Sequence, residues 1–194
     1  MPALVYLARH GQTAYNAEGR FQGQQQIPLD EVGRAQAREL AERAVPYGFR
    51  ALWCSPLLRA RETADAVAAR IVLEPREDAR LMETDAGDWT DRSFAEVIAE
   101  DPERFQAFAG AQPSFAFPGG ESFAEQERRV SAALAEVEAG ALPALVVCHG
   151  MVIRAAFASR GGAESAEPFE RVANAALVAL PPRPGASSGA PLGS

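Results

Sequence analysis

Residues 3–11 read Ala-Leu-Val-Tyr-Leu-Ala-Arg-His-Gly, and residues 144–150 read Ala-Leu-Val-Val-Cys-His-Gly. Each stretch is a short apolar run followed by His and Gly, which indicates a buried strand that ends at a loop. The chain has two histidines, so both His10 and His149 lie at such a strand end. In open α/β sheets, ligands bind at the carboxyl ends of the strands, and a glycine there permits a tight turn. We therefore expect both imidazoles at one functional edge.

The rest of the chain alternates apolar runs with helical patterns. Strands are expected where the runs are short, at residues 3–8, 51–54, 144–148 and 175–180, with 71–73 as a further candidate. Helices are expected where apolar residues recur at helical spacing, at residues 30–45, 56–70, 121–139 and 151–159. This alternation predicts an α/β protein with a mostly parallel central sheet in a three-layer α/β/α sandwich.

The domain organisation is predicted to be simple. Residues 1–180 are expected to form one domain, and residues 181–194, rich in Pro, Gly, Ser and Ala, a disordered tail. Residues 88–118 are polar and aromatic by turns, and we interpret them as a helical excursion that roofs the site. Its aromatic residues either pack the excursion or line the pocket: Trp89, Phe94, Phe105, Phe108, Phe115 and Phe117.

Charge and composition exclude several classes of partner. The net charge of −7 disfavours electrostatic binding to nucleic acid or anionic membranes. No apolar run approaches the roughly 20 residues that cross a bilayer. Residues 1–7 lack a basic leader, so a cytoplasmic protein is expected. Cys54 and Cys148 each end an apolar run and are expected to be buried thiols, not a disulfide.

Arginine occurs where an anion site would need it. All 19 basic residues are arginines, whose guanidinium groups suit bidentate contacts to phosphate. Arg9 directly precedes His10. Ser55 and Pro56 follow the second strand and have the residue types of a helix N-cap and first helical residue. Arg59 would then lie in the first turn of that helix, near the edge that carries both histidines.

These residues belong to motifs that resemble those of the histidine phosphatase superfamily, also called the phosphoglycerate mutase-like family. The resemblance rests on five ordered motifs between about residues 3 and 180: Arg9-His10-Gly11-Gln12-Thr13 with Asn16 and Gln22-Gly23; Ser55-Pro56 through Arg59 with Thr63-Ala64; Leu81-Met82-Glu83 with Gly87-Asp88-Trp89; Phe117-Pro118-Gly119-Gly120-Glu121-Ser122; and Cys148-His149-Gly150. The fourth motif resembles that of broad-specificity and α-ribazole phosphatases.

The resemblance implies a metal-independent phosphomonoester hydrolase without a cofactor. His10 would attack phosphorus and form a phosphohistidine, and a backbone carbonyl near Gly11 would fix its tautomer. Glu83 would protonate the leaving oxygen, with a pKa raised by desolvation under a roof near Trp89. The remaining residues that the resemblance places around the phosphoryl group or substrate are Arg9, Asn16, Gln22, Gly23, Arg59, His149 and Gly150.

Three other interpretations stay open at this stage. A zinc hydrolase could use His10, Glu83 and His149, although arginines beside a dication cost Coulomb energy. A mutase of the same fold would return the phosphoryl group to its substrate. A phosphometabolite- or phosphopeptide-binding domain would need the arginines but not Glu83. The expected partners are a small phosphomonoester and inorganic phosphate, with a homodimer as an alternative to a monomer.

Overall fold

The computed structural model describes residues 4–161 and 172–183. Its sheet contains β1 (Val5–Arg9), β2 (Ala51–Cys54), β3 (Pro75–Glu77), β4 (Ala144–Cys148) and β5 (Leu177–Ala179). The strand order is β3-β2-β4-β1-β5, and only the pairing of β5 with β1 is antiparallel. The prediction of a mostly parallel sheet is therefore confirmed.

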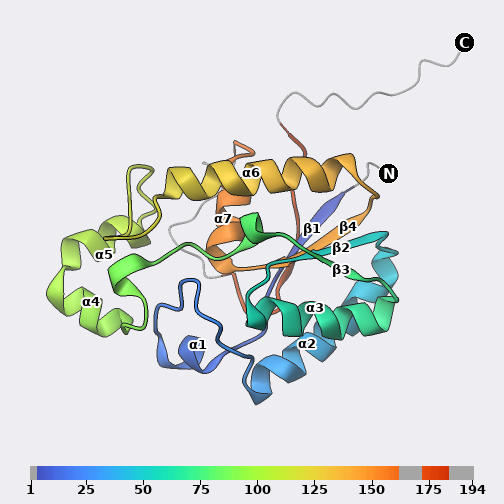
Figure 1. Ribbon diagram of the computed structural model, residues 1–194, viewed down its shortest axis with the longest axis horizontal. Coiled ribbons are helices and arrows are strands. Elements are labelled where there is room, and N and C mark those ends of the chain that lie inside the picture. The colour runs from blue at the N-terminus through green and yellow to red at the C-terminus, as the bar shows by residue number, and fades with distance from the viewer. Residues whose placement is uncertain (1–3, 162–171, 184–194) are drawn as a thin grey trace, which may run out of the picture.

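Helices cover both faces of this sheet (Figure 1). The α-helices are α1 (Ala14–Glu18), α2 (Glu31–Ala44), α3 (Leu58–Ile71), α4 (Phe94–Glu100), α5 (Pro102–Ala109), α6 (Phe123–Ala139) and α7 (Gly150–Ala158). Short 3₁₀ turns are η1 (Val45–Tyr47), η2 (Ala79–Leu81) and η3 (Gly87–Trp89). The pair α2 and α3 packs on one face and the pair α6 and α7 on the other, which confirms the three-layer sandwich.

The central strand β4 shows why the sheet needs two helical layers. Leu145 and Val147 pack in the core under α2 and α3, whereas Val146 and Cys148 pack in the core under α6 and α7. Successive residues of a strand point to opposite faces, so a run that is apolar throughout must be covered twice. Burial of each Val or Leu side chain contributes about 1.5–3 kcal/mol.

The candidate strand at residues 71–73 is wrong. Helix α3 continues to Ile71, and Val72 ends it in the left-handed conformation with φ of 58°. Ile71 and Leu73 are apolar because they pack against the core as the helix ends. The edge strand β3 begins only at Pro75 and is polar, because an edge strand needs one backbone partner and little burial.

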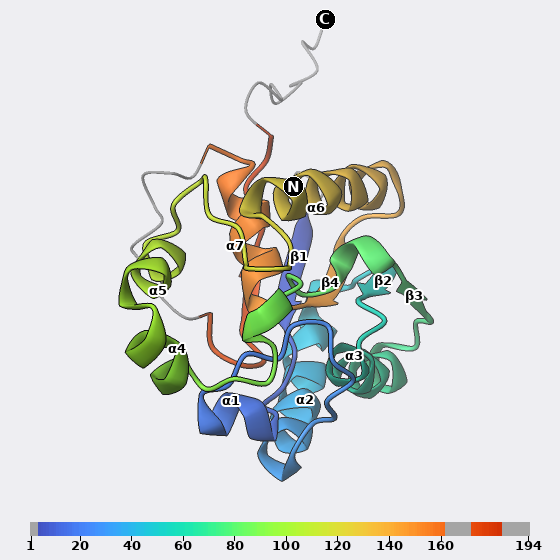
Figure 2. The same ribbon diagram turned by 60° about the vertical axis from the view of Figure 1, so that its left-hand side comes forward.

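Residues 88–118, which the sequence predicts to form a helical excursion, contain α4 and α5. Figure 2 shows both helices on the same side of the molecule as α1. Its aromatic residues pack against one another and against the loop after α1 in a separate core: Phe21, Trp89, Phe108, Phe115 and Phe117, with Phe94, Phe105 and Phe123 around them. Of the two roles left open for these side chains, packing is thus the observed one. The prediction that the excursion roofs the site stays a prediction.

The remaining expectations concern the two cysteines, membrane-spanning helices and the C-terminal tail. Cys54 and Cys148 are free and buried, and burial raises the pKa of the Cys54 thiol to about 12. Among residues 4–161 and 172–183, no helix is long and apolar enough to span a membrane. Residues 184–194 of the expected tail lie outside the described residues.

Candidate active site

The residues that follow three parallel strands lie together at one edge of the sheet. Arg9 is paired with Cys148 and Cys54 with Val147, so β1, β2 and β4 end at the same level. The backbone N–H of His10 donates to Cys148 O at 3.0 Å, and the rings of His10 and His149 lie 5.2 Å apart between centroids. The prediction that both imidazoles meet at one sheet edge is confirmed.

His10 is held in one tautomer by its own loop. Its Nδ1 lies 2.7 Å from Gly11 O and donates to that carbonyl, as the sequence predicts, which leaves the lone pair on Nε2. The side chain is 1% exposed, and burial lowers its pKa well below the usual value. The charges of Arg59 and Arg9 lower the pKa further, so His10 is neutral at neutral pH.

His149 has a partner that the sequence does not reveal. Its Nε2 lies 2.8 Å from Ser55 Oγ, and both side chains are fully buried. Burial, followed by the charge of Arg59, lowers the pKa of His149 well below its usual value. His149 Nδ1 is buried and has no hydrogen-bond partner among the residues that the structure describes.

The expected helix cap at Ser55 is wrong. The N-cap of α3 is Leu57, and the helix begins at Leu58. Ser55 Oγ instead accepts from the Leu57 N–H at 3.2 Å, within the turn that precedes the helix, and contacts His149. The serine therefore connects the end of β2 to the imidazole that follows β4.

Arg59 lies in the first turn of α3, as predicted, and is completely buried. Nη2 donates to Gly23 O at 2.9 Å and Nη1 to Gln25 O at 2.8 Å, while Nε has no partner in the described part of the chain. Burial lowers the pKa of Arg59 to about 10, although Glu83 opposes this shift. Arg59 is thus a cation at neutral pH that also fixes the loop carrying Gly23.

Arg9, the last residue of β1, is anchored by the chain segment beside β5. Its Nη1 donates to Val172 O at 2.6 Å. The side chain also approaches α7, because a Cβ built on Gly150 would lie 3.7 Å from Arg9 Nε. Arg9 and Gly150 are therefore neighbours at the same edge as His149.

Asn16 lies in α1 and Gln22 in the loop that follows it, and the amide oxygens of both side chains are occupied. Asn16 Oδ1 accepts from the Thr13 N–H at 3.1 Å and from Asn174 Nδ2 at 3.2 Å. Gln22 Oε1 accepts from Thr13 Oγ1 at 3.0 Å. Because both oxygens are engaged, the amide NH₂ groups are the ends available to donate to a ligand.

Glu83 follows η2 and is close enough to Arg59 and Arg9 for their charges to act on it. Burial raises the pKa of Glu83 above its usual value, against the opposing effects of Arg59, the Thr84 N–H and Arg9. The Thr84 N–H donates to Glu83 Oε1 at 3.0 Å. A pKa raised by desolvation is what the resemblance implies for Glu83. Trp89, near which the roof over Glu83 is expected, packs within the aromatic core.

Ser55, Arg129 and Asn174 are polar residues of the site region that the sequence interpretation missed. Arg129, on α6, donates to the backbone of residues 80, 82 and 83, and Asn174 Nδ2 donates to His10 O at 3.1 Å. Arg129 and Asn174 are far in sequence from their partners, so periodicity carries no signal for these contacts. Ser55 did carry a signal, since it follows a strand as both histidines do.

Replacement of Ser55 by alanine is expected to lower kcat/KM for a phosphomonoester about tenfold, because it leaves buried His149 Nε2 without a partner. Steady-state kinetics measures the effect. Ser159→Ala is the matched control, since Ser159 is the C-cap of α7 and its Oγ donates to Ala156 O. Equal kinetics of the two variants would show that the Ser55 contact does not orient His149.

Gly11 is required by the close approach of two backbones. A Cβ at Gly11 would lie 2.4 Å from Gly33 O at the start of α2. We expect Gly11→Ala to lower the free energy of unfolding by about 1–3 kcal/mol, as measured by denaturant titration. Gly140→Ala is the control, because its Cβ would lie 3.4 Å from Val137 O. Unchanged stability of Gly11→Ala would contradict the assigned packing.

Gly150 has ordinary space for a Cβ, so the fold alone does not require glycine there.

The charges at this edge bear on the alternative of a metal site. Among the described residues, no group of three or more His, Cys, Asp and Glu side chains is arranged to hold a metal ion. The edge of the sheet instead combines two neutral imidazoles with Arg59 and Arg9. Such an arrangement favours an anion over a dication.

The chain is similar to curated proteins and to solved structures with phosphoglycerate mutase and phosphatase names. A curated relative from Klebsiella pneumoniae, named "Probable phosphoglycerate mutase GpmB", is 38% identical over 152 residues, which cover 77% of this chain and 70% of the relative. The solved structure of a mycobacterial glucosyl-3-phosphoglycerate phosphatase with VO₃ has a TM-score of 0.84 and 32% identity, covering 91% of this chain and 90% of that chain. A structure titled "Mycobacterial hydrolase 1" has a TM-score of 0.85 and 31% identity, with 91% and 88% covered.

A family model of the histidine phosphatase superfamily (branch 1) matches residues 5–188, a range that contains every candidate site residue named above. Relatives and structural neighbours include proteins named as mutases and as phosphatases. The chain belongs to the histidine phosphatase superfamily.

Proposed function

We propose that the protein is a metal-independent phosphomonoester hydrolase that forms a phosphohistidine on His10. The state of His10 carries the proposal. Its Nδ1 proton is engaged by Gly11 O, its pKa is lowered by burial, and its Nε2 therefore holds a lone pair at neutral pH. A neutral imidazole nitrogen beside the buried Arg59 and the half-buried Arg9 is suited to attack the phosphorus of a dianionic ester.

The surrounding donors would stabilise the transferred phosphoryl group. Charge spreads over its three equatorial oxygens in the transition state, so fixed donors and cations lower the barrier. Arg59 and Arg9 supply the positive charge. His149 Nδ1 supplies a proton when Ser55 donates to Nε2, and Asn16 offers its amide NH₂. The solved structures of the mycobacterial phosphatase include complexes with VO₃ and with inorganic phosphate.

Glu83 would move the proton in both halves of the reaction. In the first half, His10 Nε2 forms a bond to phosphorus, the P–O ester bond breaks, and protonated Glu83 gives its proton to the departing oxygen. In the second half, the Glu83 carboxylate takes a proton from water, whose oxygen attacks phosphorus as the P–N bond breaks. Inorganic phosphate leaves, and Glu83 is protonated again.

Mutase activity is the second candidate, because a relative 38% identical to this chain carries a mutase name. A mutase returns the phosphoryl group from His10 to a sugar acid or alcohol instead of to water. We put the hydrolase first because the solved structure of a phosphatase is similar to this chain over 91% of its length, whereas the mutase name rests on sequence similarity alone.

The proposal is tested by hydrolysis of p-nitrophenyl phosphate between about pH 4 and pH 8 with EDTA present. Phosphate release that EDTA does not reduce is the expected result. Phosphoglycerate isomerisation without phosphate release would establish the mutase. Phosphate binding without either reaction would establish a binding domain, and activity lost in EDTA but restored by zinc would establish a metallohydrolase.

A further inference from the structure

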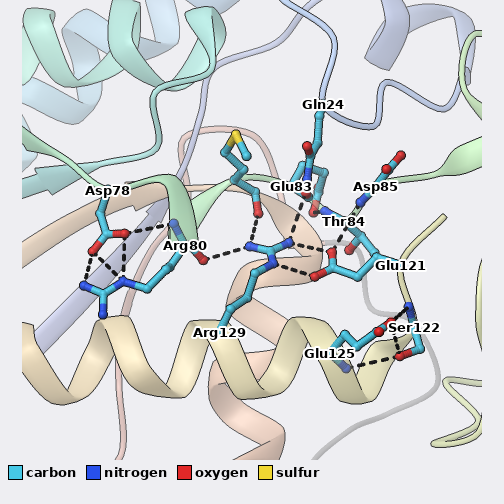
Figure 3. Close-up of polar contacts among 11 residues, drawn as sticks. Gln24, Asp78, Arg80, Glu83, Thr84, Asp85, Glu121, Ser122, Glu125 and Arg129 are labelled. Atoms are coloured by element: carbon cyan, nitrogen blue, oxygen red, sulfur yellow. Dashed lines mark hydrogen bonds and ion pairs between the residues drawn. The ribbon is translucent and has the colours of Figure 1, made fainter.

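We propose that Arg129 is a positioning residue that holds the proton donor Glu83 in place through the backbone around it. Arg129 reaches from α6 across to the segment that follows η2 (Figure 3). Its Nη1 donates to Arg80 O at 2.7 Å and to Met82 O at 2.6 Å, and its Nη2 donates to Glu83 O at 3.1 Å. The proposal rests on the proposed function, because it takes Glu83 as the acid.

Glu121 fixes the guanidinium group of Arg129 from the opposite side. Arg129 Nε donates to Glu121 Oε1 at 2.6 Å and Nη2 to Glu121 Oε2 at 2.7 Å, a bidentate ion pair whose side chains are 19% and 13% exposed. Bidentate, charge-assisted pairs constrain direction as well as distance. Arg129 is therefore a rigid connector between α6, Glu121 and the backbone on both sides of Met82.

The segment needs such a connector because little regular structure supports it. Between β3 and η3, residues 79–81 form the single turn η2, and residues 82–86 lie outside helices and strands. Gln24 Nε2 donates to Glu83 O at 3.1 Å, the same carbonyl that Arg129 contacts. Gln24 lies between Gly23 and Gln25, whose carbonyls Arg59 binds. The Glu83 backbone is thus linked through Arg129 to α6 and through Gln24 to the loop that Arg59 binds.

The charge arrangement suits a residue that orients an acid without ionising it. Arg129 contacts the Glu83 carbonyl, and its positive charge is paired with Glu121. A cation bound directly to the Glu83 carboxyl would favour the carboxylate and remove the proton that the acid must donate. Burial, the largest influence, keeps the Glu83 pKa raised. Because Arg129 contacts the Glu83 carbonyl and not its carboxyl, it can position Glu83 while burial still raises the pKa of the carboxyl.

The consequence of misplacing Glu83 depends on the leaving group. An alkoxide is a poor leaving group and needs the proton, whereas p-nitrophenolate departs with little help from an acid. Because kcat/KM reports the steps up to leaving-group departure, it is insensitive to the later hydrolysis of phosphohistidine. The ratio of kcat/KM for p-nitrophenyl phosphate to that for an alkyl phosphate therefore measures how well Glu83 acts. A general loss of folded protein would lower both values and leave the ratio unchanged.

The experiment measures this ratio for wild type, Glu83→Gln, Arg129→Met and Arg80→Met. Arg80 is the matched control, since it also joins this segment to α6, by an ion pair of 2.6 Å with Glu136, but does not contact Glu83. We expect Glu83→Gln to raise the ratio about a hundredfold or more and Arg129→Met about tenfold to a hundredfold. Arg80→Met should leave it within about threefold of wild type, the scatter usual for surface ion pairs.

A second variant covers the case in which Arg129→Met does not fold, which circular dichroism shows. Glu121→Gln keeps the shape of the pair but removes its charge, and should raise the ratio by about threefold to tenfold. An unchanged ratio in Glu121→Gln and in any folded Arg129→Met, with Glu83→Gln responding as expected, overturns the positioning role. A wild type that does not hydrolyse either ester, or an unresponsive Glu83→Gln, overturns the proposed function instead.

Discussion

Turnover is expected to fall at least about 10⁴-fold when His10 is replaced by alanine, because the variant lacks the ring nitrogen that we propose takes the phosphoryl group. The candidate nucleophile at the edge formed by β1, β2 and β4 is Nε2 of the buried His10 ring, whereas Nε2 of His149 is engaged by Ser55. The measurement is steady-state release of phosphate from p-nitrophenyl phosphate in EDTA, compared with wild type at equal protein concentration.

Binding of inorganic phosphate provides the control for His10→Ala. Arg59, Arg9 and His149 remain in the variant, so calorimetric titration should still detect phosphate, and the thermal unfolding transition should stay cooperative. A folded His10→Ala protein that keeps more than about a hundredth of wild-type turnover would contradict nucleophilic catalysis by His10.

Glu83→Gln is expected to lose activity and gain stability at the same time. Loss of the acid should lower kcat/KM for an alkyl phosphate about 10²- to 10⁴-fold. In the wild type, that activity should fall as pH rises through the raised pKa of Glu83, because the protonated carboxyl is the active form. The descending limb should be absent or displaced in Glu83→Gln. A pH profile of kcat/KM for both proteins measures this.

The stability effect has the opposite sign because burial disfavours the Glu83 carboxylate. The folded-state pKa is raised, so the native protein binds more protons than the unfolded chain between the unfolded and folded pKa values. Stability therefore falls as pH rises through that window. We expect Glu83→Gln to be more stable than wild type at neutral pH and nearly equal below the unfolded pKa of about 4.3. A lower melting temperature of Glu83→Gln than of wild type at neutral pH would contradict the inference that the buried Glu83 carboxylate destabilises the fold.

The sequence was sufficient for the parts of the fold that repeat a simple physical pattern. The runs at residues 51–54 and 144–148 are apolar throughout because both faces of β2 and β4 are covered, and their bounds are predicted to the residue. The two His-Gly pairs meet because parallel strands end at one edge of the sheet. The tautomer of His10 was also predictable, since its acceptor belongs to the next residue.

The missed features depend on contacts between distant parts of the chain. Ile71 and Leu73 are apolar because they pack on the core where α3 ends, and a short apolar run alone cannot distinguish that from a strand. Ser55 has the residue type of a cap, yet the helix starts later and its hydroxyl contacts His149 instead. Arg129 lies 46 residues from Glu83, so only the packing of α6 on the sheet brings the two together.

The most direct test of the central claim is to trap the intermediate. Wild-type protein is mixed with a phosphomonoester labelled in its phosphoryl group and quenched in alkali within the first turnover, and the digested peptides are analysed by mass spectrometry. We predict a phosphoryl group on the peptide that contains His10, stable in alkali, lost in acid and absent from His10→Ala. Product formation in the same burst with no labelled peptide, or with the label on another residue, would contradict phosphoryl transfer to His10.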